Sequence, residues 1–427
     1  MRASRLSKSR IMAGLQCGRR LWLSVYRPRC GEFSPATEAL LHQGDEVGAI
    51  ARRLYGPGTM IDGSVGLSRA VQSTRMALAW RGDLTLFEAT FRHKDVLVRA
   101  DVLERRDDAY RLVEVKSATA VREHHLRDLA VQAWVAEGAG VTIARLTLAT
   151  VDPAFTYRGG EEYSGLLCET DVTGDVRRLT QDVPGWIRGL REVLNGPLPM
   201  IAPSGRCRSP YECPYISYCE ALAGRVPTQL QAGMSRRQLD LQEIARVSVE
   251  RPNAALNGAS SRHAFLALGW FNYAVPRWAG TRPYQRVLGQ WSCRIYEGSG
   301  EIRRCDFIDL TDDAPPRRAA LSLLRALVDV DVVIVDGSDD AQCLRNMASL
   351  LPDHVTEVDR LLQGVIVARP DVVAEASTVH ILAAARDEVR RAGTTGERVL
   401  ELHSELAAAC ALRSLALARL AHEGSGA

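Results

Sequence analysis

Alternating apolar and polar residues mark three segments in the first third of the chain. Residues 85–91, 96–104 and 110–117 alternate with a period of two and are rich in Val, Leu and Phe, which predicts three β-strands. The polar run Arg105-Arg106-Asp107-Asp108 separates the last two segments and is typical of a turn. Together these segments predict an antiparallel meander.

The segment after the third predicted strand has the period of a helix. Within residues 122–134, apolar residues recur three and four positions apart, at Leu126, Leu129, Ala130 and Ala133. His125, Asp128 and Gln132 follow the same spacing and share one face of that helix. Two interpretations stay open for this face: it borders a functional site, or it is a polar face in contact with water.

The second half of the chain repeats the mixture of strand and helix patterns. Strands are predicted at residues 263–268, 290–296 and 330–335, and helices at 317–328, 341–351, 379–391 and 397–422. Before them, glycines and prolines surround a short amphipathic segment and indicate a connector. We therefore expect an α/β protein with a first domain at residues 1–225, a connector at 226–258 and a second domain at 259–427.

Composition narrows the class of protein. The chain has 427 residues, of which 46% are hydrophobic and 25% are charged, as in ordinary globular proteins of two or more domains. No apolar run approaches the roughly 18 residues that cross a bilayer, and the N-terminus lacks a secretory signal. We expect a cytoplasmic protein that does not bind membranes.

The N-terminal segment is strongly cationic. Its first 29 residues contain eight Arg and Lys residues, among them Arg19 and Arg20, and no Asp or Glu. This pattern predicts a surface that faces nucleic-acid phosphates; the alternative is a transit peptide.

Candidate catalytic residues lie on the predicted meander. Strand alternation places Glu114 and Lys116 on one face, and a hairpin brings Asp101 beside them. Asp101, Glu114 and the carbonyl of Val115 would bind Mg²⁺ or Mn²⁺, and Lys116 would hold or help deprotonate an attacking water. The alternative is a strand with charges that are simply exposed to water.

Four cysteines suggest a second site. Cys17 is separated by almost two hundred residues from Cys207, Cys213 and Cys219, which follow one another at five-residue spacings. These thiols can meet only if both ends of the domain return to one point. Zinc ligands are usually closer together, so the spacing favours a [4Fe-4S] cluster over zinc or unrelated thiols.

The other cysteines fit a different interpretation. We expect buried, unligated thiols at Cys168, Cys293, Cys305, Cys343 and Cys410, and leave Cys30 undecided.

These motifs together resemble a known family. Asp101, then Glu114-Val115-Lys116, then Gln132 on the following helix, enclosed by the four cysteines, are similar to RecB- and AddB-type PD-(D/E)XK nucleases with an iron-sulfur cluster, including the CRISPR-adaptation exonucleases. The resemblance implies a PD-(D/E)XK core clasped by the cluster, a supporting role for Gln132 and a DNA contact for His125.

A bacterial two-domain family resembles most of the chain. It joins such a nuclease to an RNase H-like exonuclease domain, and the similar stretches are Leu6-Ser7-Lys8-Ser9, Gln16-Cys17, Arg20-Leu21-Trp22-Leu23, Glu114 to Thr119, Asp128 to Gln132, Pro210 to Pro214 and Gly280 to Gln285.

The chain departs from both patterns. The nuclease family places a metal-binding His where this chain has Gly48, although His42, Asp45 or Glu46 could substitute. The family's Tyr four residues after the motif Gln is Ala136 here.

The second domain lacks the expected carboxylates. Ala267 and Gly269 occupy the positions of an Asp-x-Glu pair, and Arg413 that of a late Asp. We therefore expect a pseudo-exonuclease domain.

The sequence thus predicts a metal-dependent nuclease that acts on DNA single strands or duplex ends in repair, recombination or phage defence. RNA stays open, because no residue was found that would sense a 2′-hydroxyl. The alternatives are a silent DNA-binding scaffold and a subunit gated by a partner. No phosphate-binding glycine loop is present, so a helicase or ATPase partner would be a separate chain.

Overall fold

The computed structural model describes residues 6–224, 262–297, 300–309, 315–335 and 337–367, with positions 407, 410, 411 and 414. The chain divides into two compact units. One consists of Met1–Phe155 and Tyr163–Gly233, and the other of Thr156–Glu162 and Met234–Ala427. The predicted connector at 226–258, the predicted helix at 379–391 and most of that at 397–422 lie outside the described residues.

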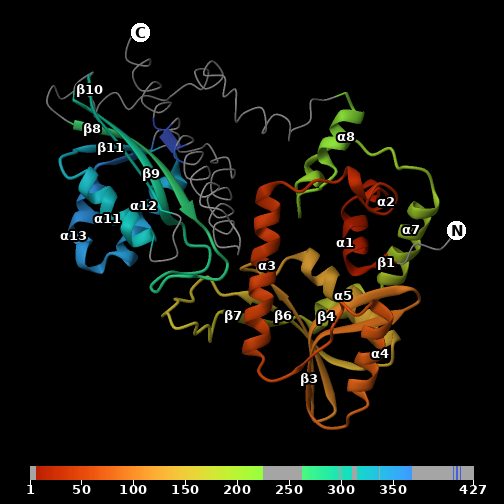
Figure 1. The fold of residues 1–427 in the computed structure, drawn as a ribbon. Coiled ribbons are helices and arrows are strands. Elements are labelled where there is room, and N and C mark those ends of the chain that lie inside the picture. The colour runs from red at the N-terminus through yellow and green to blue at the C-terminus, as the bar shows by residue number, and fades with distance from the viewer. Residues whose placement is uncertain are drawn as a thin grey trace. The chain divides into compact units, whose positions relative to one another are not determined.

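The first unit is built on a mixed sheet (Figure 1). Its strand order is β2 (Thr59–Met60), β3 (Leu84–His93), β4 (Val96–Arg106), β5 (Ala109–Lys116), β6 (Ile143–Val151) and β7 (Leu167–Asp171), and β1 (Leu6–Ser7) pairs with β4. The pairs β3–β4 and β4–β5 are antiparallel, which confirms the predicted meander. The pair β5–β6 is parallel and is joined through helix α5 (Glu123–Gly138), which confirms the helix predicted after the meander.

The turn between β4 and β5 is tighter than predicted. Arg105 and Arg106 still belong to β4, which leaves a two-residue turn. Asp107 and Asp108 form it with positive φ angles of 47° and 62°. Asp tolerates this left-handed conformation, which suits the two-residue turns that join twisted strands.

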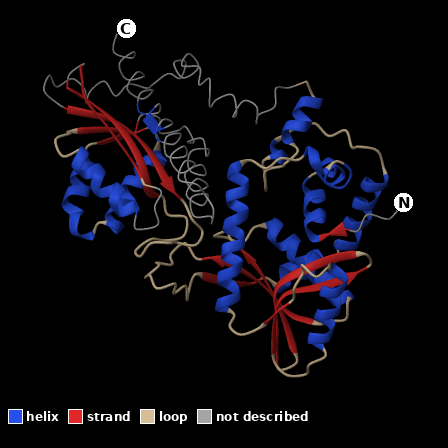
Figure 2. Cartoon of the chain, viewed as in Figure 1, coloured by secondary structure: helices blue, strands red, loops and turns tan. Residues whose placement is uncertain are grey.

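Helices of the first unit pack against both faces of its sheet (Figure 2). Helix α5 packs on β3, β4 and β6 through a core that includes Leu103, Leu112 and Leu129. Helix α3 (Pro35–Leu54) contacts β5, and Tyr55 at its end packs against Phe87. The other helices are α1 (Lys8–Gln16), α2 (Gly18–Tyr26), α4 (Leu67–Leu78), α6 (Thr173–Thr180), α7 (Val183–Asn195) and α8 (Ile216–Leu222).

The second unit contains another mixed sheet. Its order is β10 (Gly300–Ile308), β9 (Val287–Glu297), β8 (Arg262–Phe271), β11 (Val332–Val335) and β12 (Val365–Val367). The α-helices of this unit whose bounds are described are α11 (Pro315–Ala326), α12 (Ser338–Leu350) and α13 (Val355–Gln363). The predicted strands correspond to β8, β9 and β11, whereas β10, β12 and α13 were not predicted. Both units therefore have the predicted α/β character.

Strand β8 is buried on both of its faces. Leu266 and Leu268 pack into the core that includes residues of α11 and α12, whereas Phe265 packs against Tyr296 and Ile334 on the other face. A strand with two covered faces needs apolar residues at successive positions, which explains the continuous run Ala264 to Leu268.

A short excursion of the chain between β6 and β7 belongs to the second unit. The N–H of Tyr157 donates to the carbonyl of Thr281 at 2.9 Å, and the N–H of Gly280 donates to the carbonyl of Tyr157 at 2.8 Å. Residues 156–162 are therefore part of the structure around Thr281, although the chain returns to the first unit after them.

Across the described residues, no helix has the length and apolar character that a membrane span requires.

Candidate active site

The site forms where two strands of the meander separate. The last paired residues of β4 and β5 are Val102 and Val113, so Asp101 and Glu114 are the next residue on each strand beyond the ladder. The N–H of Val115 turns to Asp101 and donates to its Oδ2 atom at 2.8 Å. The end of the pairing leaves room between the strands for two carboxylates.

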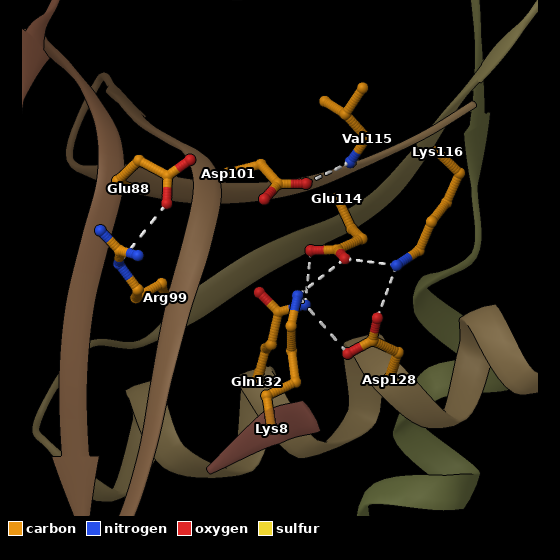
Figure 3. Close-up of polar contacts among 9 residues, drawn as sticks. All are labelled: Lys8, Glu88, Arg99, Asp101, Glu114, Val115, Lys116, Asp128 and Gln132. Atoms are coloured by element: carbon orange, nitrogen blue, oxygen red, sulfur yellow. Dashed lines mark hydrogen bonds and ion pairs between the residues drawn. The ribbon is translucent and has the colours of Figure 1, made fainter. Parts of the chain in front are cut away.

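Glu114 is the central acceptor of the site. Its Oε1 atom accepts hydrogen bonds from Lys8 Nζ at 2.9 Å and Lys116 Nζ at 2.6 Å, and its Oε2 atom accepts one from Gln132 Nε2 at 2.5 Å (Figure 3). The side chain of Glu114 is 2% exposed. The predicted group Asp101, Glu114, Lys116 and Gln132 thus comes together in the structure.

A third carboxylate, that of Asp128, completes the arrangement. Asp128 on α5 accepts a hydrogen bond from Lys116 Nζ at 2.5 Å and lies 3.6 Å from Lys8 Nζ. Two ammonium groups therefore lie between two buried carboxylates. Since each ammonium has an anionic partner on both sides, the four side chains form one network.

The network shifts the pKa values of its members. Burial alone would raise the pKa of Glu114, but the ammonium groups of Lys116 and Lys8 outweigh burial and hold it well below its usual range. Burial opposes charge on the lysines, yet Asp128 and Glu114 raise the pKa of Lys8 and of Lys116. Burial, together with the nearby Glu114, raises the pKa of Asp101 to about 7. Glu114 is thus ionised, and both lysines stay protonated at neutral pH.

The residues fit a divalent cation bound through few protein ligands. Asp101 keeps an oxygen atom that makes no hydrogen bond among the described residues, and Gln132 Oε1 is buried without a hydrogen-bond partner. In the described ranges, no three His, Cys, Asp or Glu side chains are arranged to hold a metal ion. An ion such as Mg²⁺ commonly binds one or two carboxylates and keeps several waters, which suits this donor set. The N–H of Val115, rather than its carbonyl, is the group that the structure places on Asp101, so the carbonyl ligand stays a prediction.

Lys8 and Asp128 extend the set derived from the sequence. Lys8 is 106 residues from Glu114, and it reaches the site because β1 pairs with β4 immediately before it. Asp128 was placed on the same helix face as Gln132, but it was not assigned to the site. A distinguishing signal was present for Lys8, because lysine is very rare in this chain.

Two arginines lie beside the centre. Glu88, which faces Asp101 across the register of β3 and β4, has a φ of 57° in the left-handed region. Its carboxylate lies 3.6 Å from Arg99 Nε and 3.8 Å from Arg52 Nη1. A non-glycine residue in this conformation is uncommon and often marks a functional site. Arg99 also precedes Asp101 by two residues, on the same face of β4.

Helix α3 carries no histidine at the position that the nuclease resemblance suggests. A Cβ atom at Gly48 would meet only the guanidinium of Arg52, at 3.6 Å. His42 and Asp45 are exposed. The structure gives neither of them a contact with Asp101 or Glu114 among the described residues.

The four candidate cluster cysteines line one pocket. Cys17, Cys207, Cys213 and Cys219 surround it together with Arg20 and the apolar residues Ile201, Ala202, Pro203 and Ile216. Burial raises the pKa of the Cys213 thiol to about 11. The donor set fits an iron-sulfur cluster in kind, although these thiols are not arranged as metal ligands in the described structure.

The cysteine loops are joined to the helices beside the site. Gln16 Nε2 donates to the carbonyls of Arg206 and Tyr211, at 2.6 Å and 2.7 Å. The ring of Tyr211 packs edge-on against His124 of α5, with the ring centroids 5.1 Å apart. A change in the conformation of the loop would therefore reach α5, which carries Asp128 and Gln132.

Two residues expected to contact nucleic acid lie inside the protein. Arg19 is 5% exposed, and its Nε donates to the carbonyl of Pro199 at 2.8 Å. His125 is 3% exposed, and its Nδ1 accepts a hydrogen bond from the N–H of Arg122 at 3.3 Å. Neither side chain lies on a surface that could meet phosphate, which corrects the prediction. Arg20 is half-buried and donates to Gln16 Oε1.

The positions expected to have lost catalytic carboxylates in the second unit are enclosed. Ala267 is fully buried, and its carbonyl accepts a hydrogen bond from the thiol of Cys410 at 3.3 Å. Gly269 also belongs to the buried strand β8. Arg413 lies outside the described residues.

Comparisons with known proteins give three results. Residues 269–373 match the family described as "Domain of unknown function (DUF2779)". Among curated proteins, nothing matches. The solved structure titled "Crystal structure of SSO0001" is similar, with 12% sequence identity, coverage of 42% of this chain and 75% of that chain, and a TM-score of 0.20.

Proposed function

We propose that the first unit is a metal-dependent DNA nuclease of the RecB-like PD-(D/E)XK type. The observation that carries the proposal is the convergence of Asp101, Glu114, Lys116 and Gln132 at the separated ends of β4 and β5. A pair of carboxylates with an adjacent ammonium suits metal-assisted hydrolysis of a phosphodiester, because the carboxylates can hold the cation and the ammonium can offset the charge that develops on the phosphate.

Each of these residues has a proposed role that follows from its position in the site. Asp101 and Glu114 would hold a Mg²⁺ or Mn²⁺ ion. When bound, the ion polarises the phosphate and acidifies a water molecule. Gln132 donates to Glu114 and orients that carboxylate. Because two carboxylates share the charge of Lys116, this lysine serves as a charged donor to the phosphate rather than as a base.

Arg99 and Arg52 take the place of Arg19 as candidate phosphate contacts. Their side chains are 44% and 34% exposed, and both lie against Glu88 beside Asp101. Guanidinium groups bind phosphate oxygens through two parallel hydrogen bonds. We propose that they guide a DNA strand or duplex end toward the centre.

We also propose a [4Fe-4S] cluster bound by Cys17, Cys207, Cys213 and Cys219. Support comes from the single pocket that these four thiols line and from their spacing in the sequence. The cluster would join the first helices to the loops after α7, and so stabilise the nuclease. The second unit is proposed to be a pseudo-exonuclease that binds DNA or a partner.

A second candidate is a DNA-binding scaffold without activity, or a nuclease silent until a separate helicase or ATPase delivers DNA. Gly48 favours it, because the family's histidine ligand is missing there. The charged network around Glu114 favours the active nuclease. Repair, recombination and phage defence are the proposed settings.

The first test is cleavage of end-labelled single-stranded DNA, duplex DNA and RNA with Mg²⁺ or Mn²⁺. Wild type purified without oxygen should degrade DNA, whereas Lys116→Met should be slower by about 10²- to 10³-fold, as expected when a charged donor is lost at a reaction centre. Lys94→Met is the matched control, because Lys94 is an exposed lysine on the β3–β4 turn. Folded wild type that binds but does not cleave DNA would favour the scaffold instead.

A further inference from the structure

The proposed reaction leaves the role of Lys8 open. Its ammonium lies 2.9 Å from Glu114 Oε1 and 3.6 Å from Asp128 Oδ1. Lys116 contacts the same two carboxylates, at 2.6 Å and 2.5 Å. Figure 3 shows the two lysines reaching Glu114 from different elements of the unit. Glu114 therefore has two ammonium partners, of which the reaction proposed above uses only Lys116.

The composition of the chain makes this pair significant. Of its 54 Lys and Arg residues, only Lys8, Lys94 and Lys116 are lysine. Arginine supplies the positive charge at every other position, yet two of the three lysines meet at one buried carboxylate. An ammonium is a compact point charge, whereas a guanidinium is a wide planar fork. The pair at Glu114 thus indicates a need for compact charge in this centre.

The balance of charge indicates how many metal ions the centre can take. With all five side chains ionised, Asp101, Glu114 and Asp128 exceed Lys8 and Lys116 by a single negative charge. One divalent cation would leave the centre with a single positive charge, which complements a phosphodiester. A second divalent cation would leave a large excess of positive charge in a buried site, at a high cost in free energy.

We propose that Lys8 takes the place of a second divalent cation, so that the centre binds one metal ion. The inference rests on the nuclease function proposed above. In two-metal nucleases, one ion lies at the attacking oxygen and the other at the leaving oxygen. The ammonium of Lys8, held between Glu114 and Asp128, would supply a fixed positive charge and a hydrogen-bond donor to the phosphate.

The fold holds Lys8 in place for this role. Leu6 and Ser7 pair with Val96 and Leu97 of β4, the strand that also carries Asp101. Ser7 then caps helix α1, because its Oγ accepts a hydrogen bond from the N–H of Arg10 at 3.3 Å. The backbone on both sides of Lys8 is therefore anchored next to the centre.

The test counts manganese bound to the full-length protein by equilibrium dialysis. Asp101→Asn serves to subtract ions bound elsewhere. Wild type should bind one Mn²⁺ at this centre. Lys8→Met, which removes one positive charge, should bind more than one and cleave DNA about 10²-fold more slowly. Lys8→Arg keeps the charge and should bind one ion, but its fork fits poorly between the carboxylates and cleavage should still fall.

Controls separate this role from a purely structural one. Lys94→Met should leave both the manganese count and cleavage unchanged. If Lys8→Met lowers the melting temperature but leaves the count and the cleavage rate of the folded protein unchanged, Lys8 is only a structural ion pair and the inference is wrong. Two ions in a wild type that cleaves DNA would also overturn it, while leaving the nuclease intact. A wild type that binds no manganese and cleaves nothing would overturn the proposed nuclease as well.

Discussion

At the scale of single residues, Glu114 is the group on which the centre depends. Its carboxylate is buried and accepts hydrogen bonds from two ammonium groups and one amide. A buried charge with this many donors is stabilised only as long as its partners remain, and removal of one partner of a buried pair costs about 3–5 kcal/mol. Each of these side chains is therefore expected to contribute to stability as well as to catalysis.

Asp101 predicts how metal binding depends on pH. Burial and Glu114 raise its pKa to about 7 in the metal-free protein. A metal ion needs the ionised form, so below pH 7 a proton must leave as the metal binds. The affinity for Mn²⁺ should therefore fall about tenfold for each pH unit below 7 and level off above it.

Calorimetric titration with Mn²⁺ between pH 5.5 and 8 would measure this dependence. The pH dependence of folding stability would be harder to interpret, because the shifted pKa values of Asp101 and His125 change stability in opposite directions. The raised pKa of Asp101 makes the folded protein less stable as pH rises from about 4 to about 7. Burial lowers the pKa of His125 from 6.5 to about 4, which makes the folded protein less stable as pH falls from about 6.5 to about 4. A Mn²⁺ affinity that stays constant between pH 5.5 and 7 would contradict the assignment of Asp101 as a metal ligand.

The sequence predicted the site only in part. Glu114 and Lys116 share a strand, and Asp101 lies across one hairpin, so the period of a strand was enough to bring them together. Gln132 followed from the period of the next helix. Lys8 could not be found from spacing, because its distance from Glu114 depends on the parallel pairing of β1 with β4. Burial of Arg19 was missed because a run of arginines does not reveal which of them is enclosed.

At the scale of elements, the short segments between helices carry the second proposed site. The loops after α7 bring Cys207 and Cys213 to the pocket. Cys17, the residue between α1 and α2, lines the same pocket. The side chains of Ser34 and Thr37, at the start of α3, also donate to Glu212 in the same loop. A cluster at this point would tie three distant parts of the chain together.

Substitution of a single cysteine tests that site. Cys213→Ser should remove the visible absorbance of the cluster and reduce its iron content, and should lower the melting temperature of the first unit, because the thiolate ligand and the bridge it makes are both lost. Cys168→Ser is the matched control, because Cys168 is exposed on β7 and is not among the pocket residues.

Absorbance spectra, iron analysis and thermal unfolding of protein purified without oxygen give the answer. A colourless wild type that is as stable as other domains of its size would rule out the cluster, and equal effects of the two substitutions would show that the pocket has no special role.

At the scale of the whole molecule, the two largest hydrophobic clusters of the described residues lie in different units. Leu129, on helix α5, belongs to one, and Leu268, on strand β8, belongs to the other. The alternation of strand and helix patterns predicted both units, since a mixed α/β core depends on the period of its elements. Edge elements such as β10 were missed, because an exposed strand has few apolar residues to reveal its period.

Two cores predict two calorimetric transitions. Leu129→Ala and Leu268→Ala should each destabilise one unit by about 2–5 kcal/mol, because both side chains are fully buried. Each substitution should lower the temperature of a different transition, as measured by differential scanning calorimetry. A single transition that both substitutions shift would mean that the units unfold together.

The excursion at residues 156–162 has consequences for how the two units came to share one gene and for how the first unit can be expressed as a fragment. An end-to-end fusion of two complete domains would have one connection between them. Here residues 156–162 lie in the sequence between two parts of the first unit but belong to the second, within which Tyr157 forms backbone hydrogen bonds with Gly280 and Thr281. Expression of residues 1–224 alone would leave Tyr157 without those hydrogen bonds. A fragment that replaces residues 156–162 with a short turn is therefore the better starting point for isolating the proposed nuclease.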